Sequence, residues 1–205
     1  MIKNEYLQCI KAYNVAPDRG LILWSEVEKN YSQTDRHHHT LTHLESLVSE
    51  LLPLKDRFEN WCTIVFAIVY HDIIYRSWKK NNEEKSADLA VVRLREISYP
   101  EAEISRCKEL ILATKQHQPL DEITNLFTDA DLSILGCDAA TYEAYFNQIR
   151  REYSIYPDLI YNLGRKKVLH HFLEMARIFK TDHFYDKYEN QARVNLQKEL
   201  NLLNG

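Results

Sequence analysis

The sequence predicts an all-α fold, organised as a single-domain helical bundle. The chain has 205 residues, of which 45% are hydrophobic and 27% charged, and this composition suits one globular domain with a sizeable core. Only four glycines and five prolines occur, which is too few for the repeated tight turns of an all-β protein. Apolar residues also recur at helical spacing in long segments, so helices are the expected elements.

Two segments give the clearest helical patterns. Leucines and a valine recur at helical spacing from about 36 to 52, and this helix is expected to end at Pro53, because proline disfavours helix in the preceding residue. The apolar run 61–75 is about twice as long as a usual strand and contains no turn residue, so we expect a buried helix.

The other helices are expected where a turn or capping residue precedes an apolar pattern. Short helices are expected on both sides of a break at 16–20, and Asp138, Asp158 and Asp182 are expected to cap the last three helices. The expected ranges are 4–13, 21–31, 82–97, 100–115, 138–153, 158–180 and 182–203.

Charge and cysteine usage limit the compartment and the partners. The net charge of −4 gives no basic surface for duplex nucleic acid, and no apolar run has the length of a membrane span. The four cysteines are widely spaced, and the apolar neighbours of Cys62 and Cys107 suggest buried thiols rather than bridges. We therefore expect a cytoplasmic protein that does not contact membranes.

The run 61–75 carries one imidazole and one carboxylate side by side, His71 and Asp72. A buried charge is costly without a partner, so this pair predicts either a metal site or a fixed hydrogen-bond network. Upstream, Arg36, His39 and His43 would share one face of a helix, whereas His37 and His38 would point elsewhere. A surface run of histidines explains the same triplet equally well.

Four side chains form the candidate metal set: His43, His71, Asp72 and Asp131. Two imidazoles and two carboxylates suit a borderline or hard divalent cation, whereas structural zinc sites prefer cysteine. Asp129 is the competing choice for the last carboxylate. The metal would be Mn, Mg, Fe, Co, Ni or Zn, and the residue types do not decide which.

The order of these motifs resembles the HD-domain superfamily of metal-dependent phosphohydrolases. Within it, the chain resembles a family of predicted HD phosphohydrolases with the motifs R-x-Y-H-x-x-x-H, H-D-x-x-Y and N-E-x-x-S-A. The corresponding segments are Arg36-His-His-His39-Thr-Leu-Thr-His43, His71-Asp72-Ile-Ile-Tyr75 and Asn82-Glu83-Glu-Lys-Ser86-Ala87. Further matches at 113–117, 164–165 and 192–196 extend the resemblance over about residues 21–203, and His38 stands where the family usually has tyrosine.

The resemblance implies one HD-type domain over 1–205, with core motifs at about 36–135 and C-terminal helices at 138–203. It also implies that His43, His71, Asp72 and Asp131 bind the metal; Asp131 is preferred because Ala-Asp-Leu-Ser matches the last motif of the superfamily. The spacing H-x-x-x-H is similar to that of cyclic nucleotide phosphodiesterases, in which the first histidine protonates the leaving oxygen. Carried over by motif, that role falls to His39.

Five further residues are candidates for the site. Arg36 would bind a substrate phosphate or orient a metal-binding carboxylate. Glu83 would hold a metal-bound water, or it would favour the start of a helix through the macrodipole. Lys115 and Arg165 would bind substrate, or they would be a solvated lysine and a helix-surface ion pair. His117 is a candidate second-metal ligand, although its spacing favours a histidine at a helix end.

The expected function is hydrolysis of a phosphomonoester or phosphodiester of a small, nucleotide-like molecule. A divalent cation would activate the attacking water, and His39 would protonate the leaving oxygen. The alternative is a regulatory module that binds metal or nucleotide without turnover. The expected partner is a small phosphate ester. The many aromatic residues would also suit the interface of a homodimer, but their number does not decide the oligomeric state.

Overall fold

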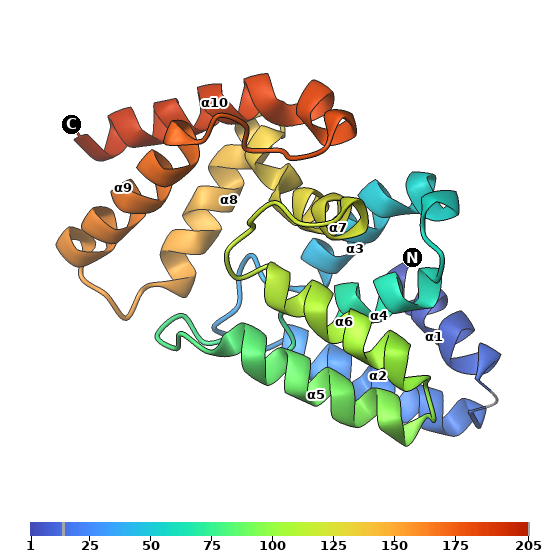
Figure 1. Ribbon diagram of the computed structural model, residues 1–205. Coiled ribbons are helices and arrows are strands. Elements are labelled where there is room, and N and C mark those ends of the chain that lie inside the picture. Colours follow the sequence, from blue (N-terminus) through green and yellow to red (C-terminus); the bar gives the residue numbers. More distant parts are fainter. Residues whose placement is uncertain (14, 205) are drawn as a thin grey trace. The chain divides into compact units, whose positions relative to one another are not determined.

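The computed structural model describes residues 1–13 and 15–204 (Figure 1). In this part of the chain every regular element is helical, with ten α-helices and two short 3₁₀ helices, so the all-α prediction is confirmed. The chain separates into two compact units, Met1–Gln118 and Pro119–Gly205, which are treated one at a time below. The single HD-type domain over 1–205 stays a prediction.

The first unit is coloured blue to green in Figure 1 and is arranged around one buried helix, α4. Helix α4 packs against α1, α3, α5 and α6. The bounds of the elements are α1 Ile2–Ala12, α2 Pro17–Tyr31, α3 Leu41–Leu51, η1 Leu52–Arg57, α4 Trp61–Tyr70, α5 Asn82–Glu96 and α6 Glu101–Ala113.

Helix α4 has apolar residues on all sides, so it can be surrounded by other helices. Among its residues only Cys62 is not buried. The side chain of Asn60 caps its start by accepting a hydrogen bond from the backbone N–H of Cys62. The helix ends at Tyr70, so the expected helix over 61–75 was too long. His71 and Asp72 lie where the chain leaves the helix, at the start of the loop to α5.

Residues 17–20 form the start of helix α2 instead of the expected break. Pro17 begins α2, because its fixed φ angle suits the first turn of a helix. Gly20 lies inside α2, and a Cβ atom there would come within 3.1 Å of Cγ2 of Ile10. The glycine therefore allows α1 and α2 to approach closely.

A disulfide joins Cys9 of α1 to Cys62 of α4, so the expectation of a buried thiol at Cys62 was wrong. The two cysteines are 53 residues apart, and only the packing of α1 on α4 brings them together. Cys107 is a buried thiol as expected, and burial raises its pKa. Disulfides are uncommon in reducing compartments, so the cysteines no longer support the expected cytoplasmic location.

The second unit is coloured yellow to red in Figure 1, and its longest helix, α10, packs against α7, η2 and α9. Gly136 ends η2 against Tyr188 of α10, where a Cβ atom would clash with the tyrosine backbone. The bounds are α7 Glu122–Leu132, η2 Ser133–Gly136, α8 Ala139–Glu152, α9 Asp158–Glu174 and α10 Asp182–Asn204.

Three helix ends in this unit differ from the sequence predictions. Helix α7 starts at Glu122, where no helix was expected, because the Asp121 side chain caps it. Asp138 caps α8 as expected, whereas Pro157 rather than Asp158 precedes α9. Helix α9 ends at Glu174 rather than near 180, because the next residue is extended.

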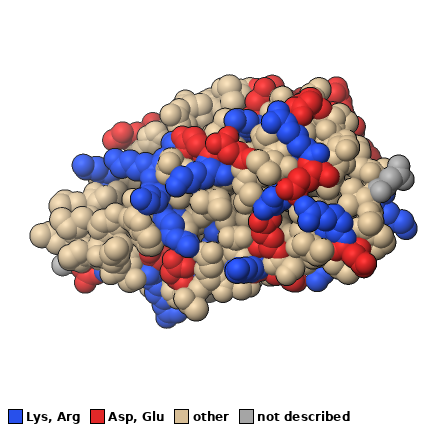
Figure 2. Space-filling view, turned by 90° about the horizontal axis from the view of Figure 1, so that it is seen from below, with Lys and Arg blue, Asp and Glu red and all other residues tan. Residues whose placement is uncertain are grey.

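Charged residues of both signs are interspersed on the face shown in Figure 2. Exposed ion pairs of the first unit include Arg95 with Glu101 and Lys108 with Asp88, and water and salt screen such surface pairs. Within the described ranges, no helix combines the length and the apolarity needed to cross a membrane.

Candidate metal centre

His71 is the first side chain of the candidate site, and its local contacts fix its tautomer. The ring is buried at the C-terminal end of α4, and Nδ1 lies 2.9 Å from the carbonyl oxygen of Ile68. A carbonyl can only accept a hydrogen bond, so Nδ1 carries the hydrogen. The Nε2 atom of the neutral ring therefore keeps its lone pair, as a metal ligand requires.

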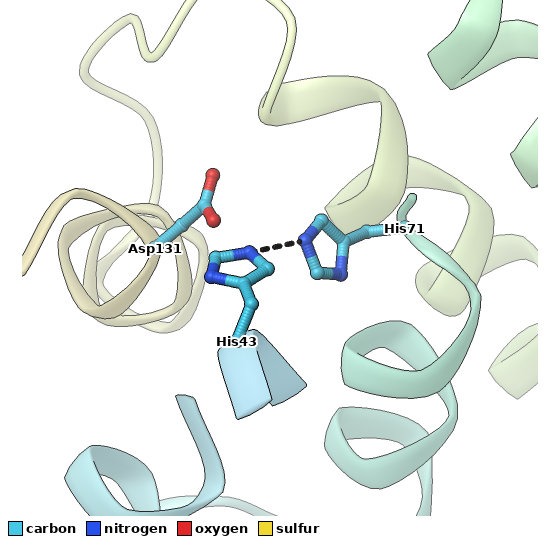
Figure 3. A group of neighbouring side chains, drawn as sticks. All are labelled: His43, His71 and Asp131. Carbon is cyan, nitrogen blue, oxygen red and sulfur yellow. Dashed lines mark hydrogen bonds between the residues drawn. The ribbon is translucent and has the colours of Figure 1, made fainter. Parts of the chain in front are cut away.

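His43 lies in the first turn of α3 and is also buried. Its Nε2 atom is 3.1 Å from Nε2 of His71, and Figure 3 shows the two rings joined by this hydrogen bond. The two imidazoles therefore direct the same nitrogen toward a common point within the first unit.

Asp72 completes a compact cluster in the first unit. Its Oδ2 atom lies 3.1 Å from Nε2 of His71 and 3.9 Å from Nε2 of His43. Ligand atoms about 2.1 Å from an ion and about 90° apart are about 3.0 Å from one another. The 3.1 Å separations fit neighbouring ligands of one divalent cation, so these donors suit the expected metal.

His39 joins the same cluster, although not by the expected helical spacing. Its Nε2 atom lies 3.8 Å from Oδ2 of Asp72. Residue Thr40 is extended and α3 begins only at Leu41, so His39 lies in the bend before the helix. The expectation that Arg36, His39 and His43 share one helical face was wrong.

The same bend places His38 differently from the prediction. Its ring centroid lies 4.9 Å from that of His39 and 4.9 Å from that of His43. The expectation that His38 points elsewhere was therefore wrong, because it assumed a helix through this segment. His38, which stands where the HD phosphohydrolase family usually has tyrosine, therefore packs against His39 and His43.

Arg36 is buried and holds the backbone that carries the cluster. Its guanidinium donates to the carbonyl oxygens of Asp72 at 2.7 Å, Ile73 at 2.8 Å and His39 at 3.3 Å. Of the two roles that the sequence left open, these contacts favour orienting the metal-binding carboxylate. The substrate-binding role stays a prediction.

Two residues of the N-E-x-x-S-A motif fix the loop that follows Asp72, a role that sequence reasoning missed. Ser86 Oγ accepts from the N–H of Ile74 at 3.1 Å and lies 3.2 Å from its carbonyl oxygen. The Asn82 side chain likewise accepts from the N–H of Arg76 and donates to its carbonyl oxygen. The signal was the motif itself, which places two small polar residues shortly after His71 and Asp72.

Lys115 makes its contacts with the start of α5 rather than with the cluster. Its ammonium group pairs with Glu84, lies 3.7 Å from Glu83 and donates to the carbonyl oxygen of Lys80. The hydrogen bond with Glu84 raises the pKa of Lys115. Both candidate residues, Lys115 and Glu83, therefore take part in an ion-pair group at the N-terminal end of α5.

Arg165 is buried in the second unit against Glu199. Two hydrogen bonds of 2.7 and 2.9 Å join the guanidinium to this carboxylate. The Tyr142 hydroxyl donates to the same carboxylate at 2.5 Å. Arg165 thus belongs to a buried ion pair rather than to a helix-surface one. In the first unit, His117 follows α6 with a positive φ angle of 51°, so it stands at a helix end.

The second unit also separates the roles of Asp129 and Asp131. Asp129 is fully buried and accepts from the N–H groups of Lys180 and Thr181 and from the Thr181 hydroxyl, with the Lys180 ammonium group 2.8 Å away. Its two oxygens therefore hold the start of α10. Asp131, half-buried on α7 and drawn in Figure 3, is the better candidate ligand.

The cluster His39, His43, His71 and Asp72 lies within the first unit, whereas Asp131 lies in the second. The expectation that Asp131 joins the cluster therefore stays a prediction. No known family, no curated protein and no solved structure matches the chain. The HD resemblance accordingly depends on the motifs quoted above.

Proposed function

We propose that this protein is a metal-dependent phosphohydrolase that cleaves a small, nucleotide-like phosphate ester. The observation that carries the proposal is the environment of His71. Its Nδ1–H is used by a backbone carbonyl, and its Nε2 lies 3.1 Å from both Nε2 of His43 and Oδ2 of Asp72. Two buried imidazoles and a carboxylate in this arrangement are explained by a shared cation.

In the proposal, His43, His71 and Asp72 hold a divalent ion and Asp131 supplies a further carboxylate. Imidazole and carboxylate are both donor types that bind divalent cations. The bound cation would polarise the phosphoryl group and supply hydroxide at neutral pH. The donor set accepts Mn, Mg, Fe, Co, Ni or Zn.

His39 would act as the general acid that protonates the leaving oxygen. It lies beside the proposed ligands, with Nε2 3.8 Å from Oδ2 of Asp72, and its side chain is partly exposed and so accessible to a substrate. A positioned acid of this kind contributes about 10²- to 10⁴-fold to a rate. In this proposal the chain supplies both the metal ligands and the proton donor that the reaction needs.

The second candidate function is a regulatory module that binds metal or nucleotide without turnover. One observation favours it: three cations expected to bind phosphate already have partners within the chain. Arg36 donates to backbone carbonyls, Lys115 pairs with Glu84, and Arg165 pairs with Glu199. The intact His39 favours the enzyme.

A hydrolysis assay separates the two functions, with free phosphate measured for monoesters and the nucleoside monophosphate product measured for cyclic nucleotides. Untagged protein is supplied with Mn²⁺ and tested on nucleotides, cyclic nucleotides and generic phosphate esters. Chelator-sensitive release that is lost in Asp72→Asn, but kept in the exposed control Asp88→Asn, supports the hydrolase. Metal binding without release from any ester supports the regulatory module.

A further inference from the structure

The ring of His39 is stacked on that of Tyr75. The ring centroids are 4.1 Å apart and the planes are inclined by 25°. Tyr75 is the last residue of the H-D-x-x-Y motif, whereas His39 belongs to the bend before α3. The contact therefore joins the two chain segments from which the cluster is built.

The Arg36 guanidinium lies near both the Tyr75 ring and the Tyr31 ring. Its distance to the ring centroid is 5.7 Å for Tyr75 and 4.9 Å for Tyr31. Tyr31 is buried, and its hydroxyl donates to the carbonyl oxygen of Val69 at 3.0 Å. The three backbone carbonyls that accept from Arg36 fix the guanidinium beside the Tyr75 ring.

The bend explains why His39 needs such support. Residues 37–40 lie outside any helix, so the regular backbone hydrogen bonds of a helix do not fix the direction of this side chain. His43 and His71, by contrast, lie in α3 and at the end of α4 and are buried. Side-chain contacts are left to orient the His39 ring, whose plane is inclined by 25° to Tyr75, 78° to His38 and 72° to His43.

We propose that Tyr75, with the Arg36 guanidinium beside its ring, is a positioning residue that holds the His39 imidazole in place to protonate the leaving oxygen. This inference depends on the proposed function, because it takes His39 as the acid. Displacing a catalytic group by about 1 Å can cost about a hundredfold in rate. Loss of the stack should therefore slow only those reactions that need the proton.

The test compares two leaving groups in Tyr75→Leu and Tyr75→Phe. An alkyl phosphate needs protonation of its leaving oxygen, whereas p-nitrophenolate leaves without it. We expect Tyr75→Leu to lower kcat for the alkyl ester by about ten- to a hundredfold and for p-nitrophenyl phosphate by no more than about twofold. Tyr75→Phe keeps the stacked ring and should restore the wild-type ratio, and metal content should be unchanged in both variants.

A second readout does not need turnover. The ring protons of His39, assigned in NMR spectra with a His39→Gln variant, should shift in Tyr75→Leu and stay near their wild-type positions in Tyr75→Phe. An equal loss of rate on both esters, or an unchanged His39 signal in Tyr75→Leu, would overturn the role of Tyr75 alone. Absence of turnover in wild-type protein on every ester would overturn the proposed function and this role together.

Discussion

Two carboxylates two residues apart on α7 have different tasks. Asp129 is enclosed by Lys180 and Thr181, whereas Asp131 is the candidate ligand. Sequence alone left the choice between them open, because the partners of Asp129 are more than 50 residues away along the chain and only folding brings them to it.

Asp129→Asn should therefore destabilise the fold. Breaking a buried ion pair typically costs about 3–5 kcal/mol in the free energy of unfolding, which urea unfolding measures. The folded fraction should keep its metal. Asp131→Asn should bind metal more weakly, but its free energy of unfolding, measured in the presence of a chelator, should change little. Equal metal loss in both variants would contradict this division.

The bend before α3 marks the limit of prediction at the residue scale. The sequence placed His39 and His43 on one face of a helix from about residue 36, but His39 precedes the helix, and the two rings lie with centroids 5.8 Å apart. Thr40 is extended, which turns His38 toward the cluster instead of away from it. Periodicity could not reveal this, because a bend has no repeating pattern.

At the scale of elements, the loop between α4 and α5 is held by side chains that reach its backbone. Ser86 is fully buried and contacts both backbone groups of Ile74. Ser86→Ala should lower stability by about 1–3 kcal/mol, because it leaves buried groups without their hydrogen bonds. Hydrogen exchange at the Ile74 amide should become faster.

The matched control for this variant is Ser105→Ala, since the Ser105 hydroxyl only donates to a carbonyl within an exposed part of α6. Its effect should stay within about 0.5 kcal/mol. If Ser86→Ala exchanged at Ile74 no faster than this control, the serine would not hold the loop.

Helices α2 and α5 are joined by a pair of hydrogen bonds, each 2.7 Å, from Arg93 to Glu26. The hydrogen bonds from Arg93 hold the pKa of Glu26 below its usual value of 4.5. The stabilisation is therefore complete above pH 4.5 and is lost as the pH falls through the lowered folded-state pKa.

Glu26→Gln should be less stable than wild type at about pH 7, and the difference should shrink toward about pH 3. Thermal unfolding across this range measures it, with the exposed Glu59→Gln as control. A difference that stays constant or grows on acidification would show that the charge of Glu26 does not contribute through this pair.

The element-scale predictions succeeded where one strong pattern dominated. The buried helix α4 follows from its continuous apolar run, and the cap of α8 follows from Asp138. Helix ends were less accurate. Helix α4 ends at Tyr70, and Arg36 binds the backbone of the loop that follows, a contact that no local sequence pattern reveals.

At the scale of the whole molecule, the disulfide between Cys9 and Cys62 was not predictable from spacing, because it closes a loop of 53 residues. Alkylation of denatured, unreduced protein should label only Cys107 and Cys137. Cys9→Ser with Cys62→Ser should lower the free energy of unfolding by about 2–4 kcal/mol. Four labelled thiols in protein purified without reductant would show that the bridge does not form.

Metal binding tests the proposed centre most directly. Untagged protein, purified and reconstituted with Mn²⁺, is dialysed and its metal measured by elemental mass spectrometry. At least one divalent ion per chain is expected in wild type and in His170→Ala, whose histidine is exposed on α9, and loss is expected in His43→Ala and His71→Ala. Metal-free wild-type protein, or equal metal in all four proteins, would contradict a centre built on His43 and His71.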